Sequence, residues 1–309
     1  MKAVFFGTPE FAVPTLRELC NSHQVLAVVT MPDRPSGRKL RLTPSPVKSF
    51  ALEKGMEIYE PVTLKNNKTL IDALSTFGAD IFVVAAYGFI LPKKILDMPK
   101  HGCINVHASL LPKYRGASPI HAAILAGESH TGITIQQMNT GVDTGDIILQ
   151  EGTEIAGDED FLCLHNRLAE IGAICVIKTL DLIEKGKATW TSQDDGISSY
   201  APMIKKTDGK IDFSNSTERI LNQIRAFSQW PGAYVSHNGK PLKIVSARHA
   251  EGFSNADAVP GTVLQASQTD GLIIKTGNGA LQIMELIPSG GKKMPSQDFL
   301  RGRRLMDFN

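Results

Sequence analysis

The chain has 309 residues, of which 42% are hydrophobic and 21% are charged, and its formal net charge is +2. This composition is typical of a soluble globular protein with one large or two ordinary domains. No apolar run approaches the roughly 18 to 20 residues that a membrane-spanning helix needs. Residues 1–7 have the pattern of a strand and a turn rather than that of a secretion signal, so we expect a cytoplasmic protein.

The first part of the chain alternates strands with helices. Thr8 is the candidate N-cap of the first helix, with Pro9 at the first helical position. Such alternation predicts a Rossmann-like α/β domain with a mostly parallel sheet, in which ligands bind at the carboxyl ends of the strands. Strands are predicted at Lys2–Phe6, Val25–Thr30, Ile81–Ala85 and Gly102–Val106, and helices at Phe11–Cys20, Thr69–Thr76 and Pro119–Ala126.

The pattern changes near Ala188. Before it, two strands (Thr131–Met138 and Ile147–Glu154) and a long helix (about Asp160 to Lys185) complete a predicted domain of residues 1–188. Residues 189–206 have few periodic apolar positions and are predicted to be a linker. Residues 207–309 are predicted to form a small OB-type β-barrel after one short helix. Its expected elements are the helix Thr217–Phe227, the strands Ala233–Val235, Leu242–Ser246, Gly261–Gln265, Leu272–Thr276 and Ala280–Leu286, and a tight turn at Gly277–Gly279.

Charge is distributed unevenly between these regions. Residues 1–204 contain 19 basic and 22 acidic side chains, whereas residues 205–309 contain 14 basic and 9 acidic ones. A basic region of this kind is typical of a protein that binds a polyanion, although a solvated basic face gives the same count. No segment is conspicuously apolar, so we expect a monomer.

An amide, an imidazole and a carboxylate form the most informative group of side chains. Asn105 and His107 are two residues apart on a predicted strand, so both side chains point to the same face. An acidic, glycine-rich turn follows at residues 141–146, where Asp143 and Asp146 compete as the carboxylate. An amide can polarise a carbonyl, an imidazole can move a proton, and a carboxylate can set the charge of the imidazole.

A long basic, proline-rich loop follows the second strand, at residues 31–48. Loops of this length inside an α/β unit are usually functional or disordered. Its basic side chains could contact phosphate groups, and its prolines would limit the entropy lost on binding. The candidate phosphate ligands are Arg34, Arg38, Lys39 and Arg41.

Two classes of site are disfavoured by what the sequence lacks. The four cysteines are scattered and form no C-x-x-C pair, which argues against a zinc site and a disulfide framework. The first turn, Gly7-Thr8-Pro9, has only one glycine of the G-x-G-x-x-G fingerprint, so a dinucleotide cofactor is disfavoured.

Taken together, these segments resemble the formyltransferase family that uses 10-formyltetrahydrofolate. The resemblance covers nearly the whole chain, and the basic loop with the C-terminal barrel resembles the branch that acts on charged initiator tRNA. The matching segments are Gly7–Phe11, Pro32–Pro35, Pro44–Lys48, Ala85–Pro92, Asn105–Pro112, Arg115–Ala117, Gly141–Asp146, Arg225–Phe227, Trp230–Pro231, Pro260–Thr262 and Gly290–Met294.

The resemblance implies roles for particular residues. Asn105, His107 and Asp143 would be the catalytic triad, with Asp143 favoured over Asp146, and no metal would be required. The basic loop and the C-terminal barrel would bind the acceptor end of initiator Met-tRNA. The residues implied to border 10-formyltetrahydrofolate are Phe89, Ile90, Leu91, Ser109, Leu110, Leu111, Pro112 and Met138.

Three rival interpretations remain at this stage. The first is formyl transfer to an amino-sugar nucleotide or another small amine, which needs neither the basic loop nor the basic barrel. The second is a non-catalytic RNA-binding protein, against which the three polar residues argue. The third is a nicotinamide-dependent dehydrogenase, which the missing glycines disfavour.

Overall fold

The computed structural model describes residues 1–36, 41–253, 258–269 and 271–301. They separate into two compact units, each assembled from segments that are not contiguous in sequence. The first unit contains residues 1–119, 130–154 and 165–201, and the second contains residues 120–129 and 155–164 together with the chain from residue 202 onward.

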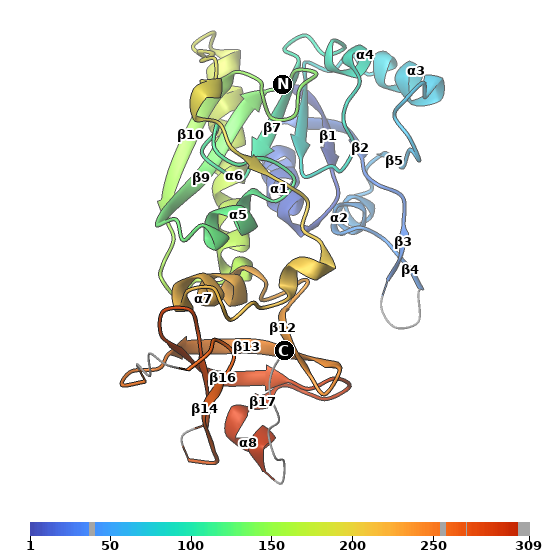
Figure 1. The fold of residues 1–309 in the computed structure, drawn as a ribbon. Coiled ribbons are helices and arrows are strands. Elements are labelled where there is room, and N and C mark those ends of the chain that lie inside the picture. Colours follow the sequence, from blue (N-terminus) through green and yellow to red (C-terminus); the bar gives the residue numbers. More distant parts are fainter. Residues whose placement is uncertain (37–40, 254–257, 270, 302–309) are drawn as a thin grey trace. The chain divides into compact units, whose positions relative to one another are not determined.

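A seven-stranded sheet forms the centre of the first unit, in the order β10-β9-β7-β6-β1-β2-β5 (Figure 1). Neighbouring strands from β5 to β7 are parallel, whereas β9 runs antiparallel to both β7 and β10. The predicted mostly parallel sheet is therefore confirmed. The strands are β1 (Lys2–Gly7), β2 (Gln24–Val29), β5 (Ile58–Tyr59), β6 (Ile81–Ala85), β7 (Cys103–His107), β9 (His130–Gln137) and β10 (Ile147–Glu154).

The two faces of β7 meet different surroundings. Cys103 packs in the core cluster that also contains Leu74 of α3 and Ile95 of α4. Val106 faces the opposite way, because a Cβ added to Gly172 of α6 would lie 2.8 Å from its Cγ1. The helices of the first unit are α1 (Val13–Ser22), α2 (Pro46–Glu53), α3 (Lys68–Thr76), α4 (Lys93–Leu96) and most of α6 (Phe161–Glu184), whereas α5 (Pro119–Leu125) falls almost wholly in the second unit. Side chains alternate between the two faces of a strand. Residues 103, 105 and 107 of β7 therefore share one face, the face on which Cys103 packs with α3 and α4.

The start of the first helix differs from the prediction. A 3-10 turn at Glu10–Ala12 precedes α1, which begins at Val13, so Thr8 is not its N-cap. The Thr8 hydroxyl instead donates to the carbonyl oxygen of Tyr87 at 2.7 Å and accepts from the backbone N–H of Met31 at 3.3 Å. The hydroxyl is thus used to join the segments that follow β1, β2 and β6.

The basic segment after β2 is more regular than the predicted loop. Its ends pair as a hairpin of β3 (Arg34–Ser36) and β4 (Arg41–Thr43), and α2 begins at Pro46 with Ser45 as its N-cap. Of the predicted phosphate ligands, Arg38 and Lys39 lie outside the described residues. Arg34 and Arg41 are described through their backbone alone.

The segment predicted to be a linker is hydrogen-bonded to the first unit over most of its length. Thr191 forms a β-bridge with Ile147, and β11 (Tyr200–Ala201) pairs in parallel with β8 (Arg115–Gly116). A 3-10 turn at Asp195–Ile197 lies between these two contacts. Residues 191–201 are therefore packed against the first unit and do not form a free linker.

The second unit is built on an antiparallel sheet in the order β12-β13-β16-β15-β14, with β17 paired to β16. The helix α7 contributes Ile220 and Ile224 to its buried core. An antiparallel β domain after one helix is confirmed, and the OB-type barrel stays a prediction. Its elements are α7 (Thr217–Ala226), β12 (Ala233–His237), β13 (Lys240–His249), β14 (Val263–Ser267), β15 (Gly271–Lys275), β16 (Ala280–Ile287), β17 (Met294–Pro295) and α8 (Ser296–Leu300), after a 3-10 turn at Lys206–Gly209.

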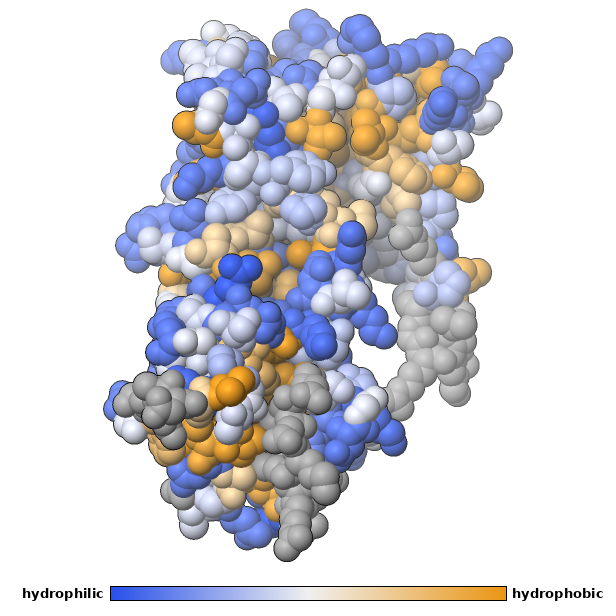
Figure 2. Space-filling model, in the orientation of Figure 1, coloured by the Kyte–Doolittle hydropathy of each residue, from blue (hydrophilic) through white to orange (hydrophobic). Residues whose placement is uncertain are grey.

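Hydrophilic and hydrophobic residues are interspersed on the face of the molecule shown in Figure 2. Over the ranges that the structure describes, no helix has the length and apolar character needed to cross a membrane.

Two glycines that face each other across β9 and β10 provide a test of this packing. Gly132 pairs with Gly152, but a Cβ on Gly132 would lie 2.2 Å from the Glu151 carbonyl oxygen, whereas one on Gly152 would meet nothing closer than 3.9 Å. We expect Gly132→Ala to lower the free energy of unfolding by about 1–3 kcal/mol, because backbone must shift. Gly152→Ala should change it by about 0.5 kcal/mol or less. Denaturant titration measures both, and equal effects would contradict the strand packing.

Candidate active site

The strand β7 places Asn105 and His107 on one face of the sheet at its carboxyl end. In register with β9, Asn105 lies opposite Gln136 and His107 lies opposite Thr134. The His107 side chain is buried, with 5% of its surface exposed, while Asn105 is half-buried. The two side chains are therefore positioned by sheet hydrogen bonds rather than by a mobile loop.

The turn between β9 and β10 brings the carboxylate of Asp143 to these two side chains. Its Oδ1 accepts hydrogen bonds from Asn105 Nδ2 at 3.3 Å and from Gln136 Nε2 at 2.7 Å. Its Oδ2 accepts from the backbone N–H of Gly116 at 2.9 Å and lies 3.5 Å from Nδ1 of His107. An ionised carboxylate only accepts hydrogen bonds, and three N–H groups donate to this one.

Asp143 is held in an uncommon backbone conformation. Its φ is +52°, in the left-handed region that asparagine and aspartate tolerate better than most residues. Gln136 fixes the turn from the sheet side, because its Oε1 accepts from the backbone N–H of Gly145 at 3.2 Å. That bond also settles the orientation of the amide, since the donor is a backbone N–H, and so Nε2 must be the atom that faces Asp143.

Gln193, in the segment predicted to be a linker, fixes the same turn from the other side. Its Nε2 donates to the carbonyl oxygens of Asp143 at 2.9 Å and of Gly145 at 2.7 Å. Its Oε1 accepts from Arg115 Nε at 3.0 Å, and the Arg115 guanidinium is also paired with Asp195 at 2.8 Å. Gln193 is thus a positioning residue for Asp143.

Sequence reasoning did not identify Gln136, Gln193 or the backbone N–H of Gly116. Gln136 is buried in β9, but Thr131 and Thr134 of the same strand are buried polar residues too, so no contrast in the sequence singles it out. Gln193 lies 50 residues after the aspartate that it supports and follows no periodic pattern.

The contacts of His107 define where its protons lie. Nε2 is 2.9 Å from the carbonyl oxygen of Tyr114, which can only accept, so Nε2 carries a proton. Nδ1 faces the Asp143 carboxylate, and a proton on that atom as well makes the ring a cation paired with Asp143. Nδ1 is thus the ring nitrogen next to Asp143, and Nε2 is the one bonded to Tyr114.

Asp146, the competing carboxylate, points elsewhere. Its Oδ1 accepts from the hydroxyl of Ser192 at 3.1 Å, and its backbone carbonyl accepts from the N–H of Gln137. Spacing alone left the choice between Asp143 and Asp146 open. The geometry brings Asp143, and not Asp146, to Asn105 and His107.

The residues predicted to border the folate differ widely in exposure. Ile90 is 73% exposed, whereas Leu91 is 2% exposed and packs in the core with Tyr87. Ser109 is fully buried, and its hydroxyl donates to the carbonyl oxygen of Lys113. The remaining members of the predicted set are partly buried or buried: Phe89, Leu110, Leu111, Pro112 and Met138. Their role stays a prediction.

Cys103, on the same strand face as Asn105, is not a nucleophile candidate. Its thiol is fully buried and contacts the carbonyl oxygens of Ile95 and Leu96. Burial raises the pKa of this thiol far above its usual range, so it stays protonated. Within the part of the chain that the structure describes, no group of three or more His, Cys, Asp and Glu side chains could hold a metal ion.

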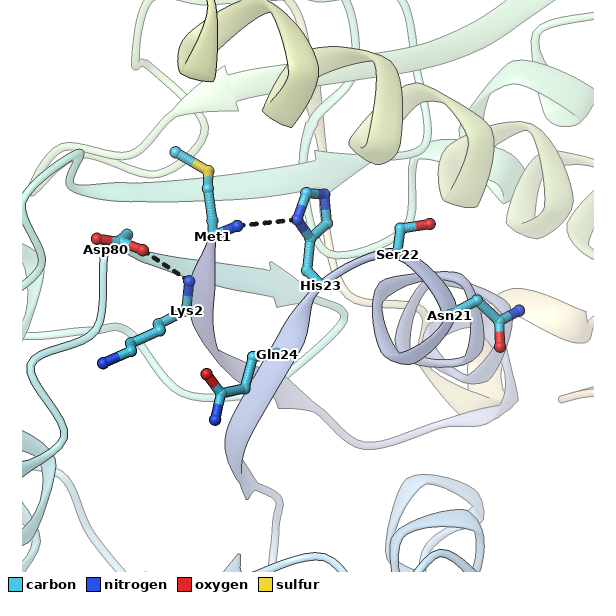
Figure 3. A pocket seen from close by; sticks show the side chains of 7 residues that line it. All are labelled: Met1, Lys2, Asn21, Ser22, His23, Gln24 and Asp80. Carbon is cyan, nitrogen blue, oxygen red and sulfur yellow. Dashed lines mark hydrogen bonds between the residues drawn. The ribbon is translucent and has the colours of Figure 1, made fainter.

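A surface pocket lies at the opposite end of the sheet and contains none of the predicted site residues. Lys2 and Asp80 line it, and the backbone N–H of Lys2 donates to the Asp80 carboxylate at 2.6 Å (Figure 3). These residues stand at the amino ends of β1 and β6. Ligands of parallel sheets bind at the carboxyl ends, where Asn105 and His107 lie.

Two family models match the two parts of this chain. A family model described as formyl transferase matches residues 1–180, and one described as formyl transferase, C-terminal domain, matches residues 203–304. The chain therefore belongs to the formyl transferase family, a family of formyl-transferring enzymes, and the resemblance inferred from the sequence is confirmed.

Curated relatives match the chain over nearly its full length. The methionyl-tRNA formyltransferase of Caldanaerobacter subterraneus subsp. tengcongensis is 46% identical over 306 residues, covering 99% of this chain and 98% of its own. The methionyl-tRNA formyltransferase of Geobacter sulfurreducens is 42% identical over 306 residues, covering 99% and 95%. Among solved structures, HypX from Aquifex aeolicus in complex with tetrahydrofolic acid has a TM-score of 0.63 at 18% identity, covering 100% of this chain and 50% of its own. That likeness shows the shared fold, and this chain spans about half the length of HypX.

Gln193→Met tests whether the turn that carries Asp143 must be fixed from outside the sheet. The variant keeps the side-chain length but removes both hydrogen bonds to the turn. Loss of a partner that orients a functional group typically costs about 10- to 100-fold, so we expect kcat for formyl transfer to fall by that factor. Ser192→Ala, which removes only the bond to Asp146, should leave kcat unchanged. Full turnover in Gln193→Met would exclude the positioning role.

Proposed function

We propose that this chain transfers the formyl group of 10-formyltetrahydrofolate to the α-amine of methionine on charged initiator tRNA, in the cytoplasm. The observation that carries the proposal is the convergence of Asn105, His107 and Asp143 at the carboxyl end of β7. The names of the relatives, at 42–46% identity over nearly the whole chain, support this acceptor over a small amine.

The reaction requires stabilisation of charge on one oxygen and the movement of protons. The amine attacks the formyl carbon, a C–N bond forms, and the carbonyl electron pair moves to oxygen. The intermediate collapses when the bond from that carbon to the leaving nitrogen breaks, the leaving nitrogen gains a proton and the attacking amine loses one. A donor fixed beside the developing oxyanion is typically worth about 10²–10³ in rate.

Asn105 is the proposed donor to the formyl oxygen. Among the described residues its side-chain amide has one hydrogen-bond partner, Asp143, so a second N–H remains to donate. The bond to Asp143 orients the amide before substrate binds, which avoids a reorganisation cost during reaction. His107 could add a second donor only if its Nε2–H is shared between the formyl oxygen and Tyr114.

The pair of His107 and Asp143 is proposed to move the protons. Nδ1 of His107 can hold a proton against the carboxylate, which stabilises the charged ring. The second carboxylate oxygen remains fixed by Gln136 and Asn105, so the pair keeps its geometry as the ring changes charge.

Residues around the carboxyl ends of β6 and β7 would hold the formyl donor. The exposed side chain of Ile90, after β6, offers an apolar surface for a flat ring system, and Leu110 and Pro112 follow β7. The backbone from Met138 to Asp143 would supply polar groups. The bound donor supplies the activated formyl group itself.

The basic hairpin of β3 and β4 is proposed to bind the acceptor end of the tRNA, together with the basic second unit. Phosphate groups bind lysine and arginine side chains electrostatically, with affinity that falls as salt rises. The base of the hairpin is held by Lys48, whose Nζ lies 2.8 Å from Asp33 and 2.8 Å from Glu60. Hydrogen bonds to these two carboxylates raise the pKa of Lys48, so it stays charged.

The direct experiment measures formyl transfer from 10-formyltetrahydrofolate to charged initiator Met-tRNA. Uncharged tRNA and an amino-sugar nucleotide are tested alongside it. Formylation of the charged tRNA alone supports both donor and acceptor. Transfer to the sugar but not to the tRNA would keep the formyl transferase and overturn the acceptor.

Asp143→Asn tests the proposed proton pair. Asparagine keeps the size of the side chain but removes the charge, so we expect kcat to fall by about 10²-fold or more. Asp146→Asn is the matched control in the same turn and should keep near-normal turnover. Asn105→Ala and His107→Ala should abolish turnover, while thermal unfolding of all three variants stays cooperative. Substantial activity in any of the three would remove that residue from the proposed triad.

Lys48→Met tests whether the base of the hairpin matters for the acceptor. Loss of both ion pairs should free the hairpin and raise the KM for charged tRNA about 10-fold, with the KM for the folate unchanged. Lys93→Met removes an exposed i,i+4 pair with Asp97 and should change neither constant. Equal KM values for tRNA in both variants would contradict the role of the hairpin base.

A further inference from the structure

Tyr200 is an exposed aromatic residue next to the proposed catalytic group. As a whole residue it is 64% exposed, although it lies in a strand. It belongs to β11, whose pairing with β8 sets Tyr200 opposite Arg115 and Ala201 opposite Gly116. An exposed ring held by backbone pairing is preorganised to receive a ligand.

Two hydrogen bonds join Ser199, the residue before Tyr200, to the strand end that carries the site. The N–H of Arg115 donates to the carbonyl oxygen of Ser199 at 2.9 Å, and the N–H of Tyr114 donates to the Ser199 hydroxyl at 2.9 Å. Tyr114 in turn accepts from His107 through its carbonyl oxygen. The position of the Tyr200 ring is therefore coupled to the strand end that carries His107.

The ring itself packs on Gly116, the residue whose N–H donates to Asp143. Gly116 has a φ of +109°, and a Cβ added to it would lie 2.6 Å from Cε2 of Tyr200. Gly116 thus lies between the Tyr200 ring and the Asp143 carboxylate, which accepts from its N–H. Most of the rest of Tyr200 is exposed to solvent.

We propose that Tyr200 is the stacking residue for the terminal base of the charged tRNA, an inference that rests on the proposed function. In a charged tRNA the reacting amine is separated from the terminal base by the ester and the ribose. A ring that lies outside the group of Asn105, His107 and Asp143 is thus suited to the base, while the methionine side chain branches from the carbon that carries the amine and stays nearer the reaction. Aromatic side chains stack on bases with little dependence on base identity.

The nearby guanidinium does not supply an alternative mode of recognition. Arg115 donates to Gln193 through Nε, and its guanidinium lies 2.8 Å from the exposed carboxylate of Asp195. Stacking on Tyr200 gives the base a contact that needs no free cation at this edge of the site.

Three variants distinguish stacking from a merely structural cover over Gly116. Tyr200→Phe keeps the ring, and Tyr200→Leu keeps an apolar cover but removes the ring. Trp190→Leu is the matched control, because Trp190 is a 50% exposed aromatic residue that bonds to Gln137 and not to the Gly116 segment. Each is assayed for the KM and kcat of formyl transfer to Met-tRNA, and for the fluorescence of uncharged initiator tRNA carrying 2-aminopurine as its terminal base.

Stacking predicts that Tyr200→Leu raises the KM for Met-tRNA by about 5- to 100-fold with kcat and folate KM unchanged. The same variant should lose the quenching of 2-aminopurine that wild type, Tyr200→Phe and Trp190→Leu retain. Unchanged KM and quenching in Tyr200→Leu would overturn the inference, as would a fall in kcat alone, which marks a structural role. Failure of wild type to formylate Met-tRNA would instead show that the proposed function itself is wrong.

Discussion

The carboxylate of Asp143 is the group around which the rest of the site is organised. Asn105, Gln136 and the backbone of Gly116 donate to its two oxygens, and His107 faces it at 3.5 Å. These partners come from β7, β9 and β8, so one carboxylate joins three separate parts of the first unit. A charge placed among fixed N–H donors needs little reorganisation when a neighbouring group changes its own charge. That is the property that a proton-transfer site requires.

Further support of this carboxylate comes from residues 191–201, which carry no periodic pattern in sequence. Gln193 holds the backbone of the Asp143 turn, and β11 holds the peptide that donates to the carboxylate. The same segment presents Tyr200 to solvent. Support of the turn that carries Asp143 and the proposed recognition of the acceptor would therefore share one stretch of chain, which links the proposed function to the proposed stacking residue.

Sequence reasoning predicts those parts of the structure that periodicity specifies. The buried runs of β1, β6 and β7 and the two-residue spacing of Asn105 and His107 place both side chains at the carboxyl end of a parallel strand. Periodicity does not predict which partner a polar side chain will choose, because the partner may be a neighbouring residue or one far away in the sequence. The Thr8 hydroxyl bonds across three strand ends instead of capping a helix, and the partners of Asp143 lie up to 50 residues away. Hydrogen bonds between distant segments leave no local pattern to read.

The most direct test of this organisation is nitrogen-15 NMR of the His107 ring, assigned by comparison with His107→Gln, across a pH titration. The contacts with Tyr114 and Asp143 require a proton on Nε2 in both charge states of the ring, with the second proton added and removed at Nδ1. A neutral ring protonated on Nε2 is the predicted result. A neutral ring protonated on Nδ1, with Nε2 bare, would contradict the arrangement around Asp143.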